Sequence, residues 1–514
     1  MRLKHTDQTY DLVVVGGGIT GAGVFSRAVA LGYKVLLTEQ QDFAWGTSSR
    51  SSKMVHGGLR YLKQGRLLLT RASVRERERL LATYPGLVTP LTFLLPVYQG
   101  RGPSKLAMTA GLNLYSFLAG QRQHRVFNRD EALARVPGLN PAALAAAFGF
   151  KDAQVDDARL VLRILFDAVD RGGQALNYTQ ALGVMRNQQG QVRAVRLRDR
   201  ESGLERQVRT RAVINATGPF AEALHPLPSS RSHLRPLRGS HLVFPGHLLS
   251  LDRVVSFLHP RDRRPVFLFP WQGALILGTT DVDHHGTLTR EPGITRAEAD
   301  YLVDGAQTVF PGQGLVMENA VSAIAGIRPV LGRGRKSASG ESREHAIWKD
   351  KGLVTVTGGK LTTFDLLAKA ALKAAGPWLP SPENQVLAAR FEADAPGPPM
   401  PDHDPWLQGR LGQRFSDLAD LMTPENRRQI PGTRTCWAEL SYGAGHEQVR
   451  HLSDLLLRRV RIGLLLPRGG LEVLEDIRFH AGPFLDWDDE RWQEEIAAYR
   501  TLWRKAHAPE GDSP

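Results

Sequence analysis

Residues 11–23 read DLVVVGGGITGAG, an apolar run followed at once by Gly16, Gly18 and Gly21 in the spacing G-x-G-x-x-G. The apolar run predicts a buried strand, and the glycines predict a tight turn that opens a helix ending near Gly32. The first glycine permits the turn, the second lets a pyrophosphate approach the backbone, and the third lets the helix pack closely on the strand. Because a helix start offers N–H groups to an anion, the segment predicts a dinucleotide-binding unit.

A second predicted strand, residues 34–38, ends just before Glu39, about 20 residues after the glycines. An acid at this position favours the hydroxyl groups of a ribose and disfavours a 2′-phosphate. A later apolar strand, residues 212–218, ends in a turn at Gly218. Flavoproteins with two dinucleotide folds have a strand of this kind, which returns to the cofactor. The glycine motif by itself does not separate NAD from FAD.

Length and composition limit the class of protein. The 514 residues exceed what one hydrophobic core normally organises, so two or three domains are expected. The lone cysteine, Cys436, excludes an internal disulfide and a CxxC site and fits a reducing compartment. We expect Cys436 to be a filler or surface residue, and the sequence indicates no metal site.

The formal net charge of +14 favours anionic partners such as phosphorylated substrates, lipid headgroups or nucleic acid. An arginine-rich composition bias would give the same excess. No zinc-finger pattern or RNA-binding aromatic signature is present, so we expect no nucleic-acid partner.

No run of about 18 apolar residues occurs, and residues 1–10 lack the apolar core of a signal peptide. Any membrane contact is therefore expected to be peripheral. Residues 106–119 are apolar with basic flanks, which suits a helix lying in the interface. A helix buried between domains is the alternative.

The order of the predicted elements indicates an α/β plus α+β chain: a Rossmann-like dinucleotide-binding domain, a β-sheet substrate domain and a helical C-terminal cap. The first two are expected to interleave within residues 1–392. Cofactor segments are placed at about 8–80, 150–225 and 320–375, and substrate segments at about 81–149 and 226–319. Residues 393–404 are Ala/Pro-rich and read as a linker before a cap over residues 405–514.

Nine segments in order resemble the FAD-dependent glycerol-3-phosphate dehydrogenase family. They are DLVVVGGGITGAG (11–23), TSSRSSKMVHGGLRYL (47–62), VDDARLVL (155–162), INATGP (214–219), RGSHLVFP (238–245), LGTTD (277–281), AGIRPV (325–330), GGKLTTFD (358–365) and DLLLRRVRIGL (454–464). The resemblance implies an FAD domain like that of p-hydroxybenzoate hydroxylase, oxidation of sn-glycerol 3-phosphate, and transfer of electrons to a membrane quinone. The departure from the family between Leu331 and Trp348 puts substrate contacts there in doubt.

The resemblance also implies site residues. His56 is expected to act as the base at the flavin edge, with Arg328 and Lys360 as cations for the phosphate. Arg60 and Tyr61 are further substrate-contact candidates, as is Arg343 in the divergent stretch. The expected cofactor-binding residues are Gly16, Gly18, Gly21, Glu39, Thr47, Ser48, Ser52, Gly218, Gly359, Leu361 and Thr362. The GTTD stretch, residues 278–281, is interpreted as structural.

Three other functions remain open: an oxidase that passes electrons to oxygen, a related flavin-dependent amine or amino-acid oxidoreductase, and a non-catalytic FAD-binding scaffold. The expected location is the cytoplasmic side of the cell membrane, with peripheral attachment. The oligomeric state is not indicated, and a homodimer stays an open alternative.

Overall fold

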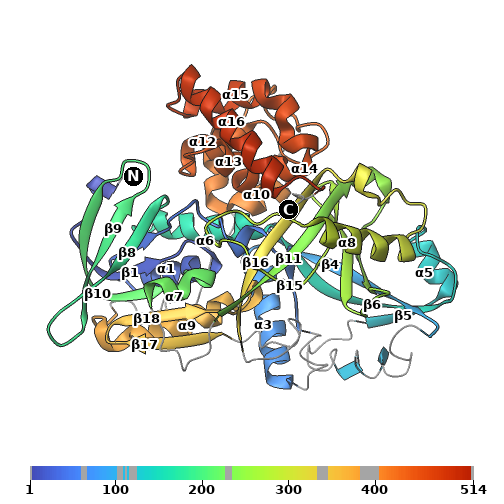
Figure 1. Cartoon of the computed structure of the whole chain (residues 1–514), viewed down its shortest axis with the longest axis horizontal. Coiled ribbons are helices and arrows are strands. Elements are labelled where there is room, and N and C mark those ends of the chain that lie inside the picture. Colours follow the sequence, from blue (N-terminus) through green and yellow to red (C-terminus); the bar gives the residue numbers. More distant parts are fainter. Residues whose placement is uncertain are drawn as a thin grey trace.

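The computed structural model describes residues 3–58, 66–100, 108–109, 111, 113–114, 124–225, 234–332, 345–382 and 405–510. Two β-sheets lie next to each other, and the C-terminal helices gather above them (Figure 1). The predicted linker at 393–404 and most of the apolar stretch 106–119 lie outside the described residues. The predicted fold class is confirmed.

The first sheet, sheet A, has a parallel core in the order β18-β10-β1-β2-β7. Antiparallel strands extend it beside β18 and β10. Its strands are β1 (Thr9–Val15), β2 (Val35–Thr38), β7 (Gln174–Leu176), β8 (Thr179–Arg186), β9 (Val192–Asp199), β10 (Glu205–Asn215), β17 (Ala346–Asp350) and β18 (Leu353–Thr357). The four central parallel strands β1, β2, β10 and β18 are built almost entirely of buried residues near their carboxyl ends, as parallel sheets covered on both faces require.

Three helices cover one face of sheet A: α1 (Ile19–Ala30), α6 (Asp157–Asp170) and α9 (Phe364–Ala375). The predicted strand–helix–strand at the N-terminus is therefore confirmed, with α1 ending beside Gly32. Helices α1 and α9 approach so closely that a Cβ at Gly23 would lie 2.6 Å from the Phe364 ring. This contact fixes the helix that follows the glycine turn against the helix that begins at Phe364.

The second sheet, sheet B, is mainly antiparallel and carries helix α8 (Arg296–Val309) on one face. Helix α3 (Leu67–Thr83) leads into this sheet. The strands are β3 (Met54–Val55), β4 (Val88–Tyr98), β5 (His124–Asn128), β6 (Leu144–Val155), β11 (Leu234–Pro245), β12 (Val254–Leu258), β13 (Pro265–Trp271), β14 (Ala274–Gly278), β15 (Val282–Asp283) and β16 (Ser322–Leu331). The short helix α5 (Arg129–Arg135) packs against β5 and β6, whereas the short helix α7 (Ala221–Leu224) packs against β8 and β18 of sheet A.

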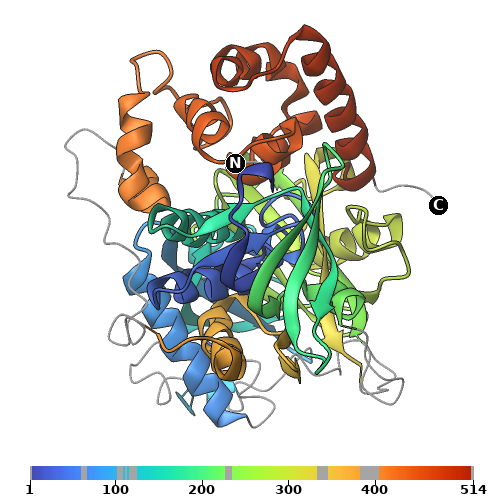
Figure 2. The same cartoon turned by 90° about the vertical axis from the view of Figure 1, so that its left-hand side faces the viewer.

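The C-terminal helices share a hydrophobic core with sheet B (Figures 1 and 2). Phe93, Phe150 and Trp271 from the sheet belong to the same buried cluster as Leu456 and Trp492 from the helices. The helices are α10 (Pro405–Leu411), α11 (Phe415–Asp420), α12 (Ala438–His446), α13 (Leu452–Asp454), α14 (Ile462–Leu465), α15 (Leu474–Ala481) and α16 (Asp489–Ala506). Of the two expectations for Cys436, the structure confirms the first: the residue is buried among these helices as a core filler and does not lie at the surface.

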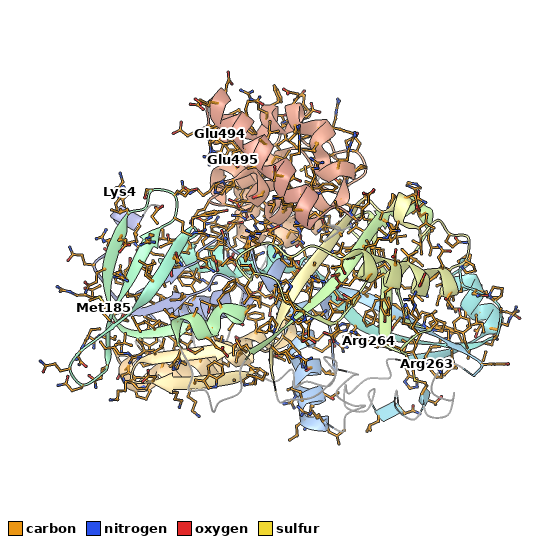
Figure 3. All side chains as sticks on the ribbon, viewed as in Figure 1. Lys4, Met185, Arg263, Arg264, Glu494 and Glu495 are labelled. Atoms are coloured by element: carbon orange, nitrogen blue, oxygen red, sulfur yellow. The ribbon has the colours of Figure 1, made fainter. Side chains whose placement is uncertain are left out.

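His451 joins the C-terminal helices to sheet A. Its Nε2 lies 3.2 Å from Glu201 in the turn between β9 and β10, and its Nδ1 lies 2.9 Å from Glu495 on α16, which is labelled in Figure 3. Burial alone would lower the pKa of His451, but its hydrogen bonds to Glu201 and Glu495 raise it to about 10. The imidazole is therefore charged at neutral pH and forms an ion pair with each carboxylate.

We expect His451→Gln to lower the Tm by roughly 2–4 °C at pH 6.5 and by much less at pH 9.5. The stabilising contribution of the charged ring is fully present below its unfolded pKa of about 6.5 and is lost as the pH rises through the folded value of about 10. Thermal unfolding of both proteins across this pH range checks the prediction. A difference in Tm that grows with pH would contradict it.

Candidate active site

A cavity of about 1830 Å³ is lined by residues of both sheets. On the sheet A side it meets the carboxyl ends of β1, β10 and β18, at Gly16, Gly218 and Gly358. On the sheet B side it is walled by residues such as Phe267 and Arg328. Ligands bind at the carboxyl ends of strands in open α/β sheets, so this is the expected position for a cofactor.

The glycine turn after β1 has the geometry that its sequence predicts. Gly16 has φ +112°, and Gly18 lies on the cavity wall. Gly21 does not line the cavity but packs on the turn, where a Cβ would lie 1.8 Å from the Gly16 carbonyl oxygen. No larger residue fits at position 21 without moving the strand from the helix, so the cradle for a pyrophosphate depends on it.

Glu39 lies beside this turn at the end of β2 and lines the cavity. Its carboxylate accepts hydrogen bonds from the backbone N–H groups of Gly17, at 2.7 Å, and Gln41, at 2.9 Å. Desolvation raises the pKa of Glu39 above its usual value, and these two N–H groups oppose the shift. The acid is therefore fixed next to the pyrophosphate cradle, where a ribose would lie.

The sequence analysis did not single out the first residues of β8 as part of the site. Gln180, Ala181 and Leu182 of β8 line the wall near Glu39, and the pairing of β8 with β9 shifts register between Ala181 and Gly183. Such an irregularity interrupts the ladder of backbone hydrogen bonds. No local motif marks these residues as part of a site.

The polar loop at residues 47–53, which we name the TSS loop, forms the middle of the cavity wall. Thr47, Ser48 and Ser52 all line the cavity, together with Arg50, which the sequence analysis did not single out. The Ser48 hydroxyl accepts a hydrogen bond from the Ile19 N–H at 2.9 Å, and the Thr47 hydroxyl donates to the Ile327 carbonyl. The Ser52 hydroxyl lies 2.9 Å from His241 Nε2. These contacts hold the loop between the glycine-turn helix and sheet B.

The GGKLT segment, residues 358–362, closes the wall after β18. Gly358 and Gly359 have φ +74° and +83°, and the chain then enters a 3₁₀ turn, η7 (Leu361–Thr363), which continues into α9. Lys360, Leu361 and Thr362 line the cavity. A helix start at this point directs unpaired N–H groups toward a ligand that carries negative charge.

His56 lies on the cavity wall between the rings of Phe93 and Phe267. Its Nδ1 lies 3.3 Å from a carboxylate oxygen of Asp152, a buried residue of β6. The other oxygen of Asp152 accepts hydrogen bonds from the Gly57 N–H at 2.8 Å and from Arg77 at 3.0 Å. Asp152 thus holds the Nδ1 side of the imidazole, which leaves Nε2 as the nitrogen that can act on a ligand.

Arg328 extends from β16 over Gly239, where a Cβ would lie 2.2 Å from its guanidinium. The guanidinium lies 3.0 Å from the Asp281 carboxylate and 3.1 Å from the Thr279 hydroxyl. Arg264 lies 3.3 Å from the other oxygen of Asp281 and also lines the cavity. The interpretation of GTTD as structural is therefore wrong, because Thr279 and Asp281 line the cavity and orient two arginines.

Basic side chains outnumber acidic ones in the cavity wall around Arg328. Arg263, which is labelled with Arg264 in Figure 3, and Arg290 add to the basic lining. No spacing rule in the sequence links Arg264 or Asp152 to the site. Three predicted substrate residues, Arg60, Tyr61 and Arg343, lie outside the described residues. Within the described part of the chain, no cluster of His, Cys, Asp or Glu could hold a metal ion.

Comparisons with known proteins agree with this geometry. The family of FAD dependent oxidoreductases matches residues 11–373, and the C-terminal domain of alpha-glycerophosphate oxidase matches residues 401–492. Glycerol-3-phosphate dehydrogenase 2 of Mycobacterium tuberculosis is 33% identical over 518 residues, which cover 96% of this chain and 88% of that protein. The aerobic glycerol-3-phosphate dehydrogenase of Staphylococcus aureus is 35% identical over 366 residues, 70% of this chain and 66% of that protein.

Solved structures show the same fold. The glycerol-3-phosphate dehydrogenase of Bacillus halodurans, complexed with FAD, has a TM-score of 0.76 and 25% identity over 97% of this chain and 96% of that one. The L-alpha-glycerophosphate oxidase of Mycoplasma pneumoniae, with FAD bound, has a TM-score of 0.57 and 18% identity over 72% of this chain and 95% of that one. The glycine cradle, the Glu39 carboxylate and the helix start after Gly359 fit this cofactor. The chain belongs to the FAD-dependent glycerol-3-phosphate dehydrogenase family, and FAD is its cofactor.

Proposed function

We propose that the protein oxidises sn-glycerol 3-phosphate to dihydroxyacetone phosphate and that its electrons pass to a membrane quinone. One observation carries the substrate assignment. A single cavity is lined by the dinucleotide cradle, by the His56–Asp152 pair and by the cations Arg328, Arg264 and Lys360. The names of the relatives support the same substrate.

The phosphate dianion would bind at the cationic end. Arginine can donate two parallel hydrogen bonds to phosphate, and lysine adds a compact charge. Arg328 and Arg264 are held in place by one shared carboxylate, Asp281, so their guanidinium groups are oriented before the substrate arrives. Preorganisation of this kind lowers the entropy that binding costs.

His56 Nε2 would take the proton of the hydroxyl group at carbon 2, because Asp152 holds the opposite nitrogen. FAD, when bound, accepts the hydride from carbon 2. The backbone N–H groups at the start of η7 and α9 would stabilise negative charge on the cofactor ring. Phe93 and Phe267 beside His56 give this part of the cavity apolar walls.

Two features support a quinone as the acceptor. Part of the cavity wall is apolar, with Leu95, Val97, Met108 and Leu258 among its residues, and suits an apolar ring. Helix α3 lies on the side of the molecule opposite the C-terminal helices (Figures 1 and 2). Leu67 and Leu68 in its first turn are 44% and 84% exposed.

Arg71 and Arg75 are also exposed on α3, so the helix combines exposed leucines with basic residues. Such a helix end would suit an anionic lipid surface. Among the described residues, no helix has the length and apolarity needed to cross a bilayer. We therefore propose peripheral attachment to the inner face of the cell membrane.

Anaerobic titration with glycerol 3-phosphate tests the substrate. We expect stoichiometric bleaching of the visible absorbance of the flavin, and none with glycine as the amino-acid control. Reoxidation by a soluble quinone should then be at least about tenfold faster than by air. Rapid reoxidation in air alone would identify an oxidase, and unbleached flavin would exclude both enzymes.

Leu68→Gln tests the membrane surface in the same assay, with the quinone supplied in anionic vesicles. We expect slower reoxidation than for the wild type, whereas Leu204→Gln, a change of a second exposed leucine on sheet A, should have no effect. Equal rates for all three proteins would remove α3 from the proposal.

His56→Gln should lower kcat by roughly 10²–10⁴-fold while the flavin spectrum stays unchanged. Asp152→Asn should lower kcat by a smaller factor, roughly tenfold, because the imidazole loses its carboxylate partner at Nδ1 while Nε2 stays in place. His247→Gln, a change of an exposed histidine, serves as the control. Steady-state kinetics with an artificial acceptor measure the three variants, and an unchanged kcat for His56→Gln would remove it from the role of base.

Arg328→Lys should raise KM by roughly tenfold or more and change kcat little, because lysine keeps the charge but loses the two-pronged contact. Arg235→Lys is the matched control. Arg235 pairs with Asp283 on the neighbouring strands much as Arg328 pairs with Asp281, but it does not line the cavity. A similar rise in KM for both variants would contradict a specific phosphate contact.

A further inference from the structure

Three arginines from the C-terminal region contact the cofactor-binding part of the chain. Arg458, Arg459 and Arg461 are almost fully buried, at 2%, 0% and 0% exposure. A π-helical turn, η11 (Leu455–Arg459), precedes Arg461, and the Val460 N–H donates to the Leu455 carbonyl at 3.0 Å. Arg461 itself has φ +62°. A π turn followed by a left-handed arginine is costly, and such features concentrate at functional sites.

Arg458 and Arg459 bind the loop that follows Glu39. Arg459 donates to both oxygens of the buried Asp42 carboxylate, at 2.7 and 2.9 Å, and Arg458 donates to one of them. Burial alone would raise the pKa of Asp42, but the guanidinium groups of Arg459 and Arg458 lower it well below its usual value. The carboxylate is therefore ionised and fixed three residues after Glu39.

Arg461 binds the TSS loop from the side opposite the cavity. It donates to the Ser49 carbonyl at 2.8 Å and lies 3.3 Å from Asp157, with its guanidinium 5.3 Å from the ring of Trp271. Lys53 donates to the same Ser49 carbonyl at 2.7 Å. Two cationic donors on one carbonyl oxygen fix the backbone at the centre of the loop.

The residues on either side of Ser49 line the cavity. Ser48 and Arg50 line the cavity, as do Ser51 and Ser52. Asp157, the partner of Arg461, also accepts hydrogen bonds from the Ser51 N–H at 2.9 Å and hydroxyl at 2.7 Å. A displacement of Arg461 would therefore also move the cavity wall, because the Ser49 carbonyl and the Asp157 carboxylate connect the two.

We propose that Arg461 is a positioning residue of the flavin site, through which the C-terminal helices hold the TSS loop in its FAD-binding conformation. Arg461 does not line the cavity, and it contacts the TSS loop through Ser49 directly and through Asp157. The inference rests on the FAD site and is independent of the substrate proposed above.

Arg461→Lys tests the proposal, because lysine keeps the charge near Asp157 but cannot bridge both partners. Arg410→Lys is the matched control. Arg410 is 1% exposed and comes from the same group of helices. It lies 3.5 Å from Asp156, which Arg461 also approaches, at 3.6 Å, but among the described interactions no contact joins Arg410 to the TSS loop. FAD is titrated into each apoprotein without glycerol 3-phosphate, and the Tm of each apoprotein is measured alongside.

We expect Arg461→Lys to raise the Kd for FAD roughly tenfold or more and to change the visible circular dichroism of the bound flavin. Arg410→Lys should lower the Tm but leave the Kd within about twofold of the wild type. A wild-type Kd for Arg461→Lys would overturn the proposal. So would an equal loss of FAD affinity in both variants, because it would show only a general loss of stability.

Discussion

The carboxylate of Asp157 is the contact on which the cofactor half of the molecule depends. It is fully buried at the start of α6. It accepts hydrogen bonds from Lys53 at 2.8 and 2.9 Å, from Arg461 at 3.3 Å and from the N–H and hydroxyl of Ser51. Removing one member of a buried group of this kind leaves charges unpaired and typically costs about 3–5 kcal/mol. Through this one side chain, sheet A, the TSS loop and the C-terminal helices share a common anchor.

The strand–helix–strand unit could be predicted from the sequence because its determinants are local. Gly16, Gly18 and Gly21 lie within six residues, and the bounds of β1, α1 and β2 differ from expectation by only a few positions.

The opposite wall of the cavity could not be predicted in this way. His56 and Asp152 are 96 residues apart in the sequence, and Arg328 and Asp281 are 47 apart. Both pairs form only because sheet B brings distant strands together. The wrong interpretation of GTTD has the same origin. Nothing near residues 278–281 indicates that β16 will place an arginine beside them.

The TSS loop has a consequence for the order in which the protein matures. Chains fold from the N-terminus as they are synthesised, so the glycine turn and β2 exist long before residues 458–461 leave the ribosome. Until those residues arrive, Asp42 and Asp157 lack their arginine partners, and the wall at Ser49 lacks its outer support. The residues of the glycine turn are thus synthesised early, whereas Asp42 and the loop beside the flavin gain their full support only when nearly the whole chain has emerged.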